Sequence, residues 1–158
     1  MKPIIAAPQR HDFHDSSLLN LVISPTLDVL ELILSTPNEV GEAENWLVRF
    51  VGLLKFDFET LGIGVGGQFP IEIYDIYIDE ESRELKKWKE RLIALALDKN
   101  EVKKVAHVVL ASSFYRGWEA NDTKEGIEII CRSWEIERAP SEYDKLKYIR
   151  PYIEAGKE

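Results

Sequence analysis

The chain has 158 residues, of which 45% are hydrophobic and 30% are charged, a composition that excludes an intrinsically disordered chain. This length suits one domain with one core, and no linker, internal repeat or low-complexity block divides the chain. We therefore expect a single domain over residues 1–158. The net charge of −8 argues against nucleic acid as a partner, because phosphates would repel it. Such a charge favours solubility, or else a basic protein partner.

The cysteine content and the N-terminus bear on the compartment. The single cysteine, Cys131, cannot form an internal disulfide, which fits a reducing cytoplasm best. The apolar piece near the N-terminus is too short for the core of a signal peptide or for a transmembrane helix. We therefore expect a cytoplasmic protein with no membrane partner.

The first third of the chain predicts an arm and a hairpin. Residues 1–16 are expected to be an irregular arm, because Pro3 and Pro8 disfavour helix in the residues before them. Leu18–Ile23 and Leu27–Ser35 are then predicted to be strands. The turn Ser24-Pro25-Thr26 separates them, so they are expected to pair as a hairpin.

The longest pattern in the chain is the alternation from Glu44 to Thr60, which predicts a long strand. One face of this strand is fully apolar; its residues are Trp46, Val48, Phe50, Gly52, Leu54, Phe56 and Phe58. The other face also carries apolar residues, namely Leu47, Val51 and Leu53. This second face could be covered by the arm, by the C-terminal segment or by a second copy of the chain in a homodimer.

A glycine-rich stretch, residues 62–67, follows the long strand. A phosphate-binding loop would need a helix directly after the glycines, and here Phe69-Pro70 and an alternating run follow instead, so we interpret the stretch as a hairpin connection. Ile71–Ile78 is predicted to be the fourth strand. The period then changes to about 3.6, which predicts one long helix from Glu80 to Leu97. Its apolar face is formed by Leu85, Trp88, Leu92 and Leu95.

The last part of the chain predicts two more strands and a short helix. Val102–Phe114 is apolar on both faces, so this strand is expected to be covered on both sides. Gly126–Glu137 is the sixth strand, and Ser141 with Asp144 forms a capping box that opens a short C-terminal helix. The predicted fold is α+β: a mostly antiparallel sheet of about six strands, one long helix packed on one face and a short C-terminal helix. The core is expected to join the Trp46–Phe58 face to the leucines of the long helix.

Two places offer residues for chemistry. The first is a cluster in the arm, formed by His11, Asp12, His14 and Asp15, whose imidazoles and carboxylates are metal-binding groups. The His-x-x-His spacing specifies no ligand geometry, so a local turn is the competing interpretation, and no metal or other cofactor is expected. The second is Cys131, which lies within a predicted strand and is expected to be buried and structural.

A third set of residues suggests a docking surface. Acidic and aromatic residues fall in several predicted loops and strand ends, and aromatic residues are enriched at interface hot spots. The candidate partner-binding residues are Tyr74, Tyr77, Tyr115, Trp118, Glu119, Asp122 and Glu125. A partner with a basic surface would be attracted to them over long range.

Phe13-His14-Asp15-Ser16 leads directly into the two hairpin strands, which precede the long aromatic strand, the helix and two late strands. In this order the chain resembles small bacterial immunity proteins of contact-dependent and polymorphic toxin systems. The resemblance implies a cytoplasmic, non-enzymatic protein that binds a toxin domain and blocks its site; it implies no catalytic residues. Two alternatives remain open: a small metal-dependent hydrolase using His11, His14 and Asp15, and a structural homo-oligomer.

Overall fold

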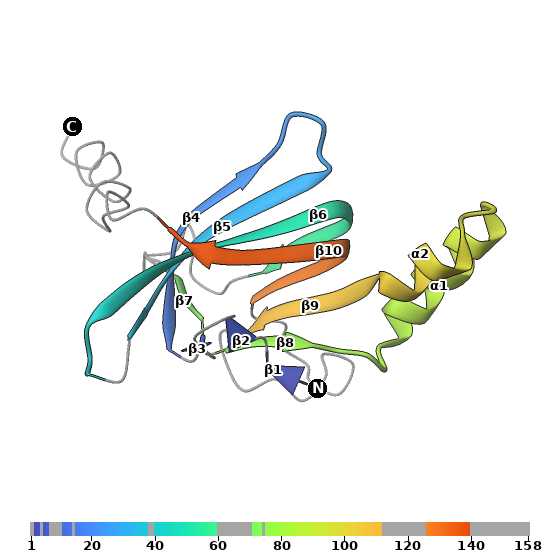
Figure 1. Cartoon of the computed structure of the whole chain (residues 1–158). Coiled ribbons are helices and arrows are strands. Elements are labelled where there is room, and N and C mark those ends of the chain that lie inside the picture. Colours follow the sequence, from blue (N-terminus) through green and yellow to red (C-terminus); the bar gives the residue numbers. More distant parts are fainter. Residues whose placement is uncertain are drawn as a thin grey trace.

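The computed structural model describes residues 2–3, 5–6, 11–13, 15–37, 40–59, 71–73, 75–111 and 126–139. Most of them belong to one antiparallel sheet of the order β1-β8-β9-β10-β6-β5-β4-β7 (Figure 1). Its strands are β1 (Lys2–Pro3), β4 (Ser16–Ile23), β5 (Val29–Pro37), β6 (Ala43–Glu59), β7 (Ile71–Ile73), β8 (Asp75–Ile78), β9 (Ala106–Ala111) and β10 (Gly126–Arg138). The helices in this part of the chain are α1 (Arg83–Ala94) and α2 (Lys99–Lys104). Six of these strands have four residues or more, so the predicted α+β fold with a mainly antiparallel sheet is confirmed.

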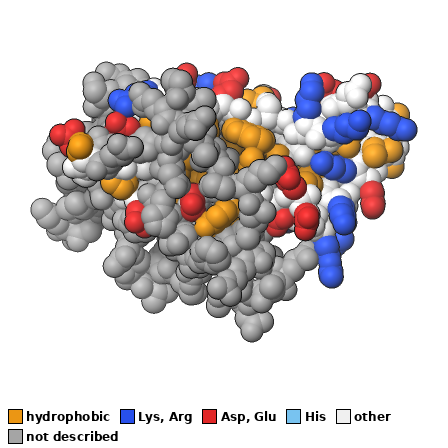
Figure 2. All heavy atoms as spheres, turned by 60° about the horizontal axis from the view of Figure 1, so that its bottom comes forward, with side chains coloured by type: hydrophobic (Ala, Val, Ile, Leu, Met, Phe, Trp, Pro, Cys, Tyr) orange, Lys and Arg blue, Asp and Glu red, His pale blue; other side chains and the backbone are white. Residues whose placement is uncertain are grey.

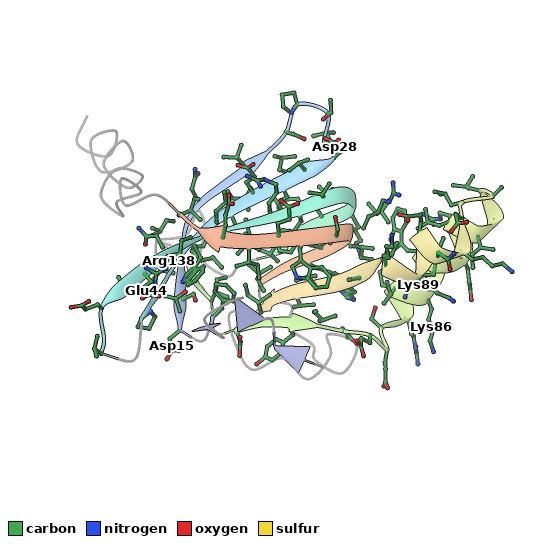
Figure 3. All side chains as sticks on the ribbon, viewed as in Figure 1. Asp15, Asp28, Glu44, Lys86, Lys89 and Arg138 are labelled. Atoms are coloured by element: carbon green, nitrogen blue, oxygen red, sulfur yellow. The ribbon has the colours of Figure 1, made fainter. Side chains whose placement is uncertain are left out.

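The hairpin of β4 and β5 forms as its sequence predicts. The backbone N–H of Ser24 donates to the carbonyl of Val29 over 2.9 Å, which closes the turn. The Ser24 and Thr26 hydroxyls both donate to the carboxylate of Asp28, and these bonds, that of Thr26 first, hold the pKa of Asp28 below its usual value. Figure 3 shows Asp28 at the outer end of this hairpin.

The pairing of β6 with β10 bends the sheet into two layers. The two strands pair from Glu59 with Gly126 to Trp46 with Arg138, and the register shifts between Ile130 and Cys131. An irregularity of this kind bends a strand and increases its twist. At this place both strands turn back in Figure 1. The first part of β6 therefore lies with β5 and β4, and its last part lies with the half of β10 that pairs with β9.

The segment predicted as the fourth strand, Ile71–Ile78, is in fact two strands with different partners. Strand β7 pairs with β4 and strand β8 pairs with β9, although one residue separates them in the sequence. The chain therefore links one end of the sheet order to a strand near its other end. The two layers are closed on this side by a continuous piece of backbone, so their inner faces enclose one core, as in a sheet curled into a barrel.

The main core fills the space between the layers. Its largest fully buried side chains include Trp46, Phe50 and Phe13. The rings of Phe13 and Trp46 meet edge to face, with their centroids 6.2 Å apart. The prediction that this core also contains the helix leucines is wrong. Leu85 and Leu92 form a separate cluster with Val102, Val105 and Ile130, which we call the helix cluster, and Leu95 is 68% exposed.

The bend also changes which side chains of β6 face the core. The buried side of β6 begins as predicted, with Trp46, Val48 and Phe50. After Gly52 the pattern shifts: Leu53 packs against the main core, and Leu54 packs against the helix cluster. The predicted seven-residue apolar face is thus interrupted, because the irregularity changes the direction of the side chains that follow it.

The helices are shorter than the one long helix that the sequence predicts. Helix α1 has 12 residues and ends at Ala94, whereas α2 occupies residues 99–104, where the fifth strand was expected to begin. Figure 1 shows both helices beyond the ends of the strands rather than across a face of the sheet. Strand β9 begins at Ala106, and all six of its residues are buried, which confirms the expectation that this strand is covered on both sides. The predicted C-terminal helix lies outside the described residues.

The N-terminal residues contain more regular structure than the predicted irregular arm. Strand β1 pairs with the edge of β8, and β2 (Ile5–Ala6) pairs with β3 (His11–Asp12) in a separate two-stranded sheet. Phe13 is fully buried in the main core. Next to it, the hydroxyl of Ser16 donates to the carbonyl of Phe13 over 2.6 Å and lies 2.8 Å from the hydroxyl of Thr36.

The bend gives the first prediction. Gly52 has φ +65°, and a Cβ at this position would lie 2.7–2.8 Å from three side-chain carbons of Arg132. We expect Gly52→Ala to lower the free energy of unfolding by about 2 kcal/mol or more, because left-handed backbone alone costs an L residue about 1–2 kcal/mol. Gly41→Ala is the matched control: Gly41 has φ +81°, and a Cβ there would meet no atom within 4 Å. Urea denaturation that gave equal losses for both variants would contradict the close approach at the bend.

Candidate interaction surface

A buried polar network attaches the start of α1 to strands β9 and β10. The hydroxyl oxygen of Ser82 lies 2.7 Å from Nδ1 of His107, and Nε2 of His107 lies 2.9 Å from Oε1 of Glu128. The last contact has the distance of an ion pair but not the direction of a hydrogen bond. The three side chains come from the residue before α1, from β9 and from β10, and all three are buried.

This network has the connectivity of a Ser–His–carboxylate triad, but its serine is already used by the helix. Ser82 is the N-cap of α1, and its oxygen accepts the backbone N–H of Leu85 over 2.9 Å. Each polar group has a partner when the Ser82 hydroxyl donates to Nδ1 of His107 and the proton on Nε2 faces the carboxylate of Glu128. In this role the network positions α1 and supplies no free nucleophile.

Ion pairs attach both helices to the bend. Lys55 Nζ lies 3.7 Å from Glu128 and 3.4 Å from Glu84, so it links β6 to β10 and to α1. Arg132 Nη2 lies 3.0 Å from Glu101 of α2. Hydrogen bonds from Lys104 and Arg132, in that order of strength, lower the pKa of Glu101. Together with the helix cluster, these contacts hold the helix pair, residues 83–104, in a fixed place on the sheet.

The far end of the helix pair is an exposed apolar tip formed by residues 93–97, Ile-Ala-Leu-Ala-Leu. All five residues are exposed, and the large side chains Ile93, Leu95 and Leu97 are 48%, 68% and 38% exposed. The backbone of the tip is well ordered by hydrogen bonds: Ala96 donates to Ile93 over 3.0 Å and Leu97 donates to Leu92 over 3.2 Å. This is a Schellman ending in which Ala96, at φ +61°, occupies the position that glycine usually takes.

The helix pair differs in charge from the rest of the protein. Residues 83–104 contain eight lysines and arginines against four acids, a net charge of +4. The remainder of the chain contains twelve against twenty-four, a net charge of −12. Figure 2 shows lysine and arginine side chains along this part of the molecule, with hydrophobic side chains at its far end. The apolar tip therefore belongs to the part of the protein with a net positive charge.

The structure describes few of the residues that were predicted to bind a partner. Tyr74, Tyr115, Trp118, Glu119, Asp122 and Glu125 lie outside the described residues. The prediction for Tyr77 needs correction, since this residue is only 8% exposed and packs with Val109 and Ala111 on the outer face of the sheet. Two acidic residues of the neighbouring strands, Asp75 and Glu128, are also buried.

The histidine cluster of the N-terminus stays a prediction. His14 and the side chains of His11 and Asp12 lie outside the described residues, and Asp15 is exposed with φ 56°. Within the described part of the chain, no group of three or more His, Cys, Asp or Glu side chains is placed to hold a metal ion.

The second face of β6 carries both apolar and charged side chains. Leu47 and Val51 are half-buried there, but Leu53 points to the main core. Between them, Arg49 lies 2.9 Å from Glu31, 3.1 Å from Glu135 and 3.7 Å from Glu137. The hydrogen bonds to Glu31 and then Glu135 raise the pKa of Arg49. At one end of this strand pair, Arg138 lies 2.8 Å from Glu44 and stacks over the Trp46 ring, and Figure 3 shows the two labelled residues side by side.

Comparisons with known proteins add little. No protein-family model and no curated protein matches this chain. Among solved structures, the crystal structure of an uncharacterized protein from Neisseria gonorrhoeae is similar, with 15% sequence identity and a TM-score of 0.47, over 80% of this chain and 94% of that one. A likeness of this degree carries no argument. In the described residues, no helix is long and apolar enough to cross a membrane.

Sequence reasoning missed both features of this region. The buried network needs the strand register, because Glu128 pairs with Val109 and reaches His107 only diagonally. The apolar tip does have a sequence signal: five apolar residues in a row, 93–97, exceed what a one-sided helix needs. The prediction assigned Leu95 to the core because it continued the spacing of Leu85 and Leu92.

The buried network gives a second prediction. Ser82→Ala removes the cap of α1 and also leaves Nδ1 of His107 without its partner, so we expect it to cost about 2–3 kcal/mol. Asp98→Ala is the matched control, because Asp98 caps α2 through bonds to Asn100 and Glu101 at the exposed surface. This variant should cost about 1 kcal/mol. Equal losses in chemical denaturation would show that the contact with His107 adds nothing.

The cysteine gives a third prediction. Cys131 is fully buried, as expected, and burial raises the pKa of its thiol to about 12. Because the thiolate is the reactive form, the native protein should react very slowly with a thiol reagent at pH 8, and the unfolded protein should react fully. Rapid reaction of the native protein, measured by mass spectrometry at several urea concentrations, would contradict this burial.

Proposed function

We propose that this protein is not an enzyme and acts by binding another protein. More specifically, we propose that it is a cytoplasmic immunity protein that neutralises a toxin domain by binding it. The observation that carries the protein-binding part is the apolar tip, residues 93–97. A run of exposed apolar residues lowers solubility and is retained where it serves an interaction. The resemblance in element order to immunity proteins supports the toxin-neutralising form.

The way the tip is held supports a binding role. Ser82, Lys55 and Arg132 attach the two helices to the sheet, and the Schellman ending orders the tip itself. Ala96 occupies a left-handed conformation that costs an alanine about 1 kcal/mol, which glycine would avoid. A pre-ordered apolar surface loses little conformational entropy on binding, so more of its contact energy contributes to affinity.

The proposal is tested by cross-linking at defined positions. A photo-reactive amino acid replaces Leu95 in the full-length protein, and the same amino acid replaces Val40 in a control. Val40 is 78% exposed and belongs to the β5–β6 connection, at the opposite end of the molecule from the helices (Figure 1). Cross-linking in the native host should join one protein to position 95 and not to position 40. For the toxin-neutralising form, that protein should inhibit growth when expressed alone, and co-expression of the binding protein should restore growth.

The fourth prediction concerns the affinity for that partner. Leu95→Asp should raise the Kd at least tenfold, which corresponds to about 1.4 kcal/mol, because it places a charge in an apolar contact. Val40→Asp introduces the same charge elsewhere and should leave the Kd within about twofold. Calorimetric titration measures both. An unchanged Kd for Leu95→Asp would remove the tip from the binding site.

A further inference from the structure

The charges around the apolar tip indicate what it binds. Several cations of the body are paired internally: Arg49 with three glutamates, Arg138 with Glu44, and Lys55 with Glu84 and Glu128. On the helix pair, by contrast, a set of lysines forms no ion pair within the described part of the chain. These are Lys86, Lys87, Lys89, Lys99 and Lys103.

These lysines lie along both helices, between the tip and the sheet. Lys86 and Lys89 are three residues apart on α1, so they lie on one face of that helix, and Figure 3 shows both on the lower side of the helix pair. Lys99 begins α2, one residue after the tip with Asp98 between them, and Lys103 follows one turn later. Opposite charges on a partner would neutralise them at little cost, because no internal ion pair must be broken first.

We infer that the helix pair docks into an apolar pocket with an acidic rim on the protein partner; this inference rests on the proposed protein-binding function. The tip is a protruding element, so the matching surface must be concave, and its apolar residues require an apolar pocket. The unpaired lysines require carboxylates at the edge of that pocket. The predicted partner-binding residues 119–125, which would attract a basic surface, lie outside the described residues.

The charge of the body favours a protein over a lipid membrane as the occupant. A basic surface with an exposed apolar tip also suits an anionic bilayer. A flat membrane, however, would bring anionic lipid close to a body that carries −12, and this body would be repelled. A partner protein can place its acids around the helix pair alone. The opposite charges of the two parts also orient the encounter, so that the helix pair meets an acidic partner first.

The fifth prediction tests the chemistry of the pocket with defined probes. A fluorescent amphipathic peptide of glutamate and leucine, its lysine-and-leucine counterpart, and vesicles of mixed phosphatidylcholine and phosphatidylserine are each titrated with the full-length protein. The acidic peptide should bind, Leu95→Asp should abolish the binding, and rising salt should weaken it. Stronger binding to the lysine peptide or to the vesicles, or no binding to the acidic peptide, would overturn the inference.

Matched charge variants show whether the place of the charge matters. Lys86→Gln and Val40→Glu each lower the net charge by one, the first on the helix pair and the second at the far end of the molecule. Lys86→Gln should raise the Kd for the acidic peptide about threefold, and the double variant Lys86→Glu/Lys89→Glu should raise it about tenfold or more. Val40→Glu should raise this Kd less than about twofold. Equal effects of Lys86→Gln and Val40→Glu would mean that only total charge matters, and the acidic rim would be wrong.

Affinity and association rate, measured with the natural partner, show whether the acidic rim or the binding function itself is wrong. If the protein cross-linked at position 95 loses affinity with Leu95→Asp but associates at a rate that salt does not change, the binding function holds and the acidic rim fails. If Leu95→Asp leaves the affinity for this protein unchanged, the tip is not part of the binding site and the proposed function fails at this point. A partner that depends on Leu95 and whose association slows with salt and with Lys86→Glu/Lys89→Glu supports both.

Discussion

The bend of the β6–β10 ribbon at Gly52 is the constraint on which the rest of the structure depends. The backbone at φ +65° and the close side chain of Arg132 make any residue larger than glycine strained at position 52. Strands that pass from one layer to another at such an irregularity form the corner of a folded sheet. Here the corner brings the inner faces of both layers together around Trp46 and Phe50, and its outer side receives Leu54 and Ile130 against the helices. The position of the helix pair, and hence of its apolar tip, follows from this corner.

Much of the fold follows from local patterns, and the errors have identifiable causes. Alternation located the strands of the sheet, and the two apolar faces of β9 correctly indicated burial on both sides. Alternation alone could not show that the Ile71–Ile78 run changes partners after three residues, because partner choice depends on contacts distant in sequence. The long helix was overextended because its end has alanine where glycine would mark the stop. The shifted side chains after Gly52 needed the register with β10, which no local pattern contains.

The same distinction applies to the candidate site. Charged and aromatic residues in loops were chosen from their types alone, and Tyr77 shows the weakness of this choice, because strand neighbours bury it. His107 was visible as a lone histidine in a strand, but its contacts with Ser82 and Glu128 join three separate elements. The apolar tip was the feature that the sequence indicated most directly, since residues 93–97 form an uninterrupted apolar run. It was assigned to the core because a helical period was continued past the point where the helix ends.

The pairing of β6 with β10 also has a consequence for how the protein is made. Arg138 and Glu44, which lie 2.8 Å apart, are separated by 94 positions in the chain. On the ribosome, β6 emerges long before β10, so its inner face, with Trp46 and Phe50, has no complete cover until β10 has been made. The helix pair has local backbone hydrogen bonds, but its cluster includes Ile130 of β10, so its packing is also completed late. A fold whose corner depends on such distant strands is expected to fold slowly. Until β10 pairs with β6, the three strands β4, β5 and β6 expose apolar surface that is prone to aggregation.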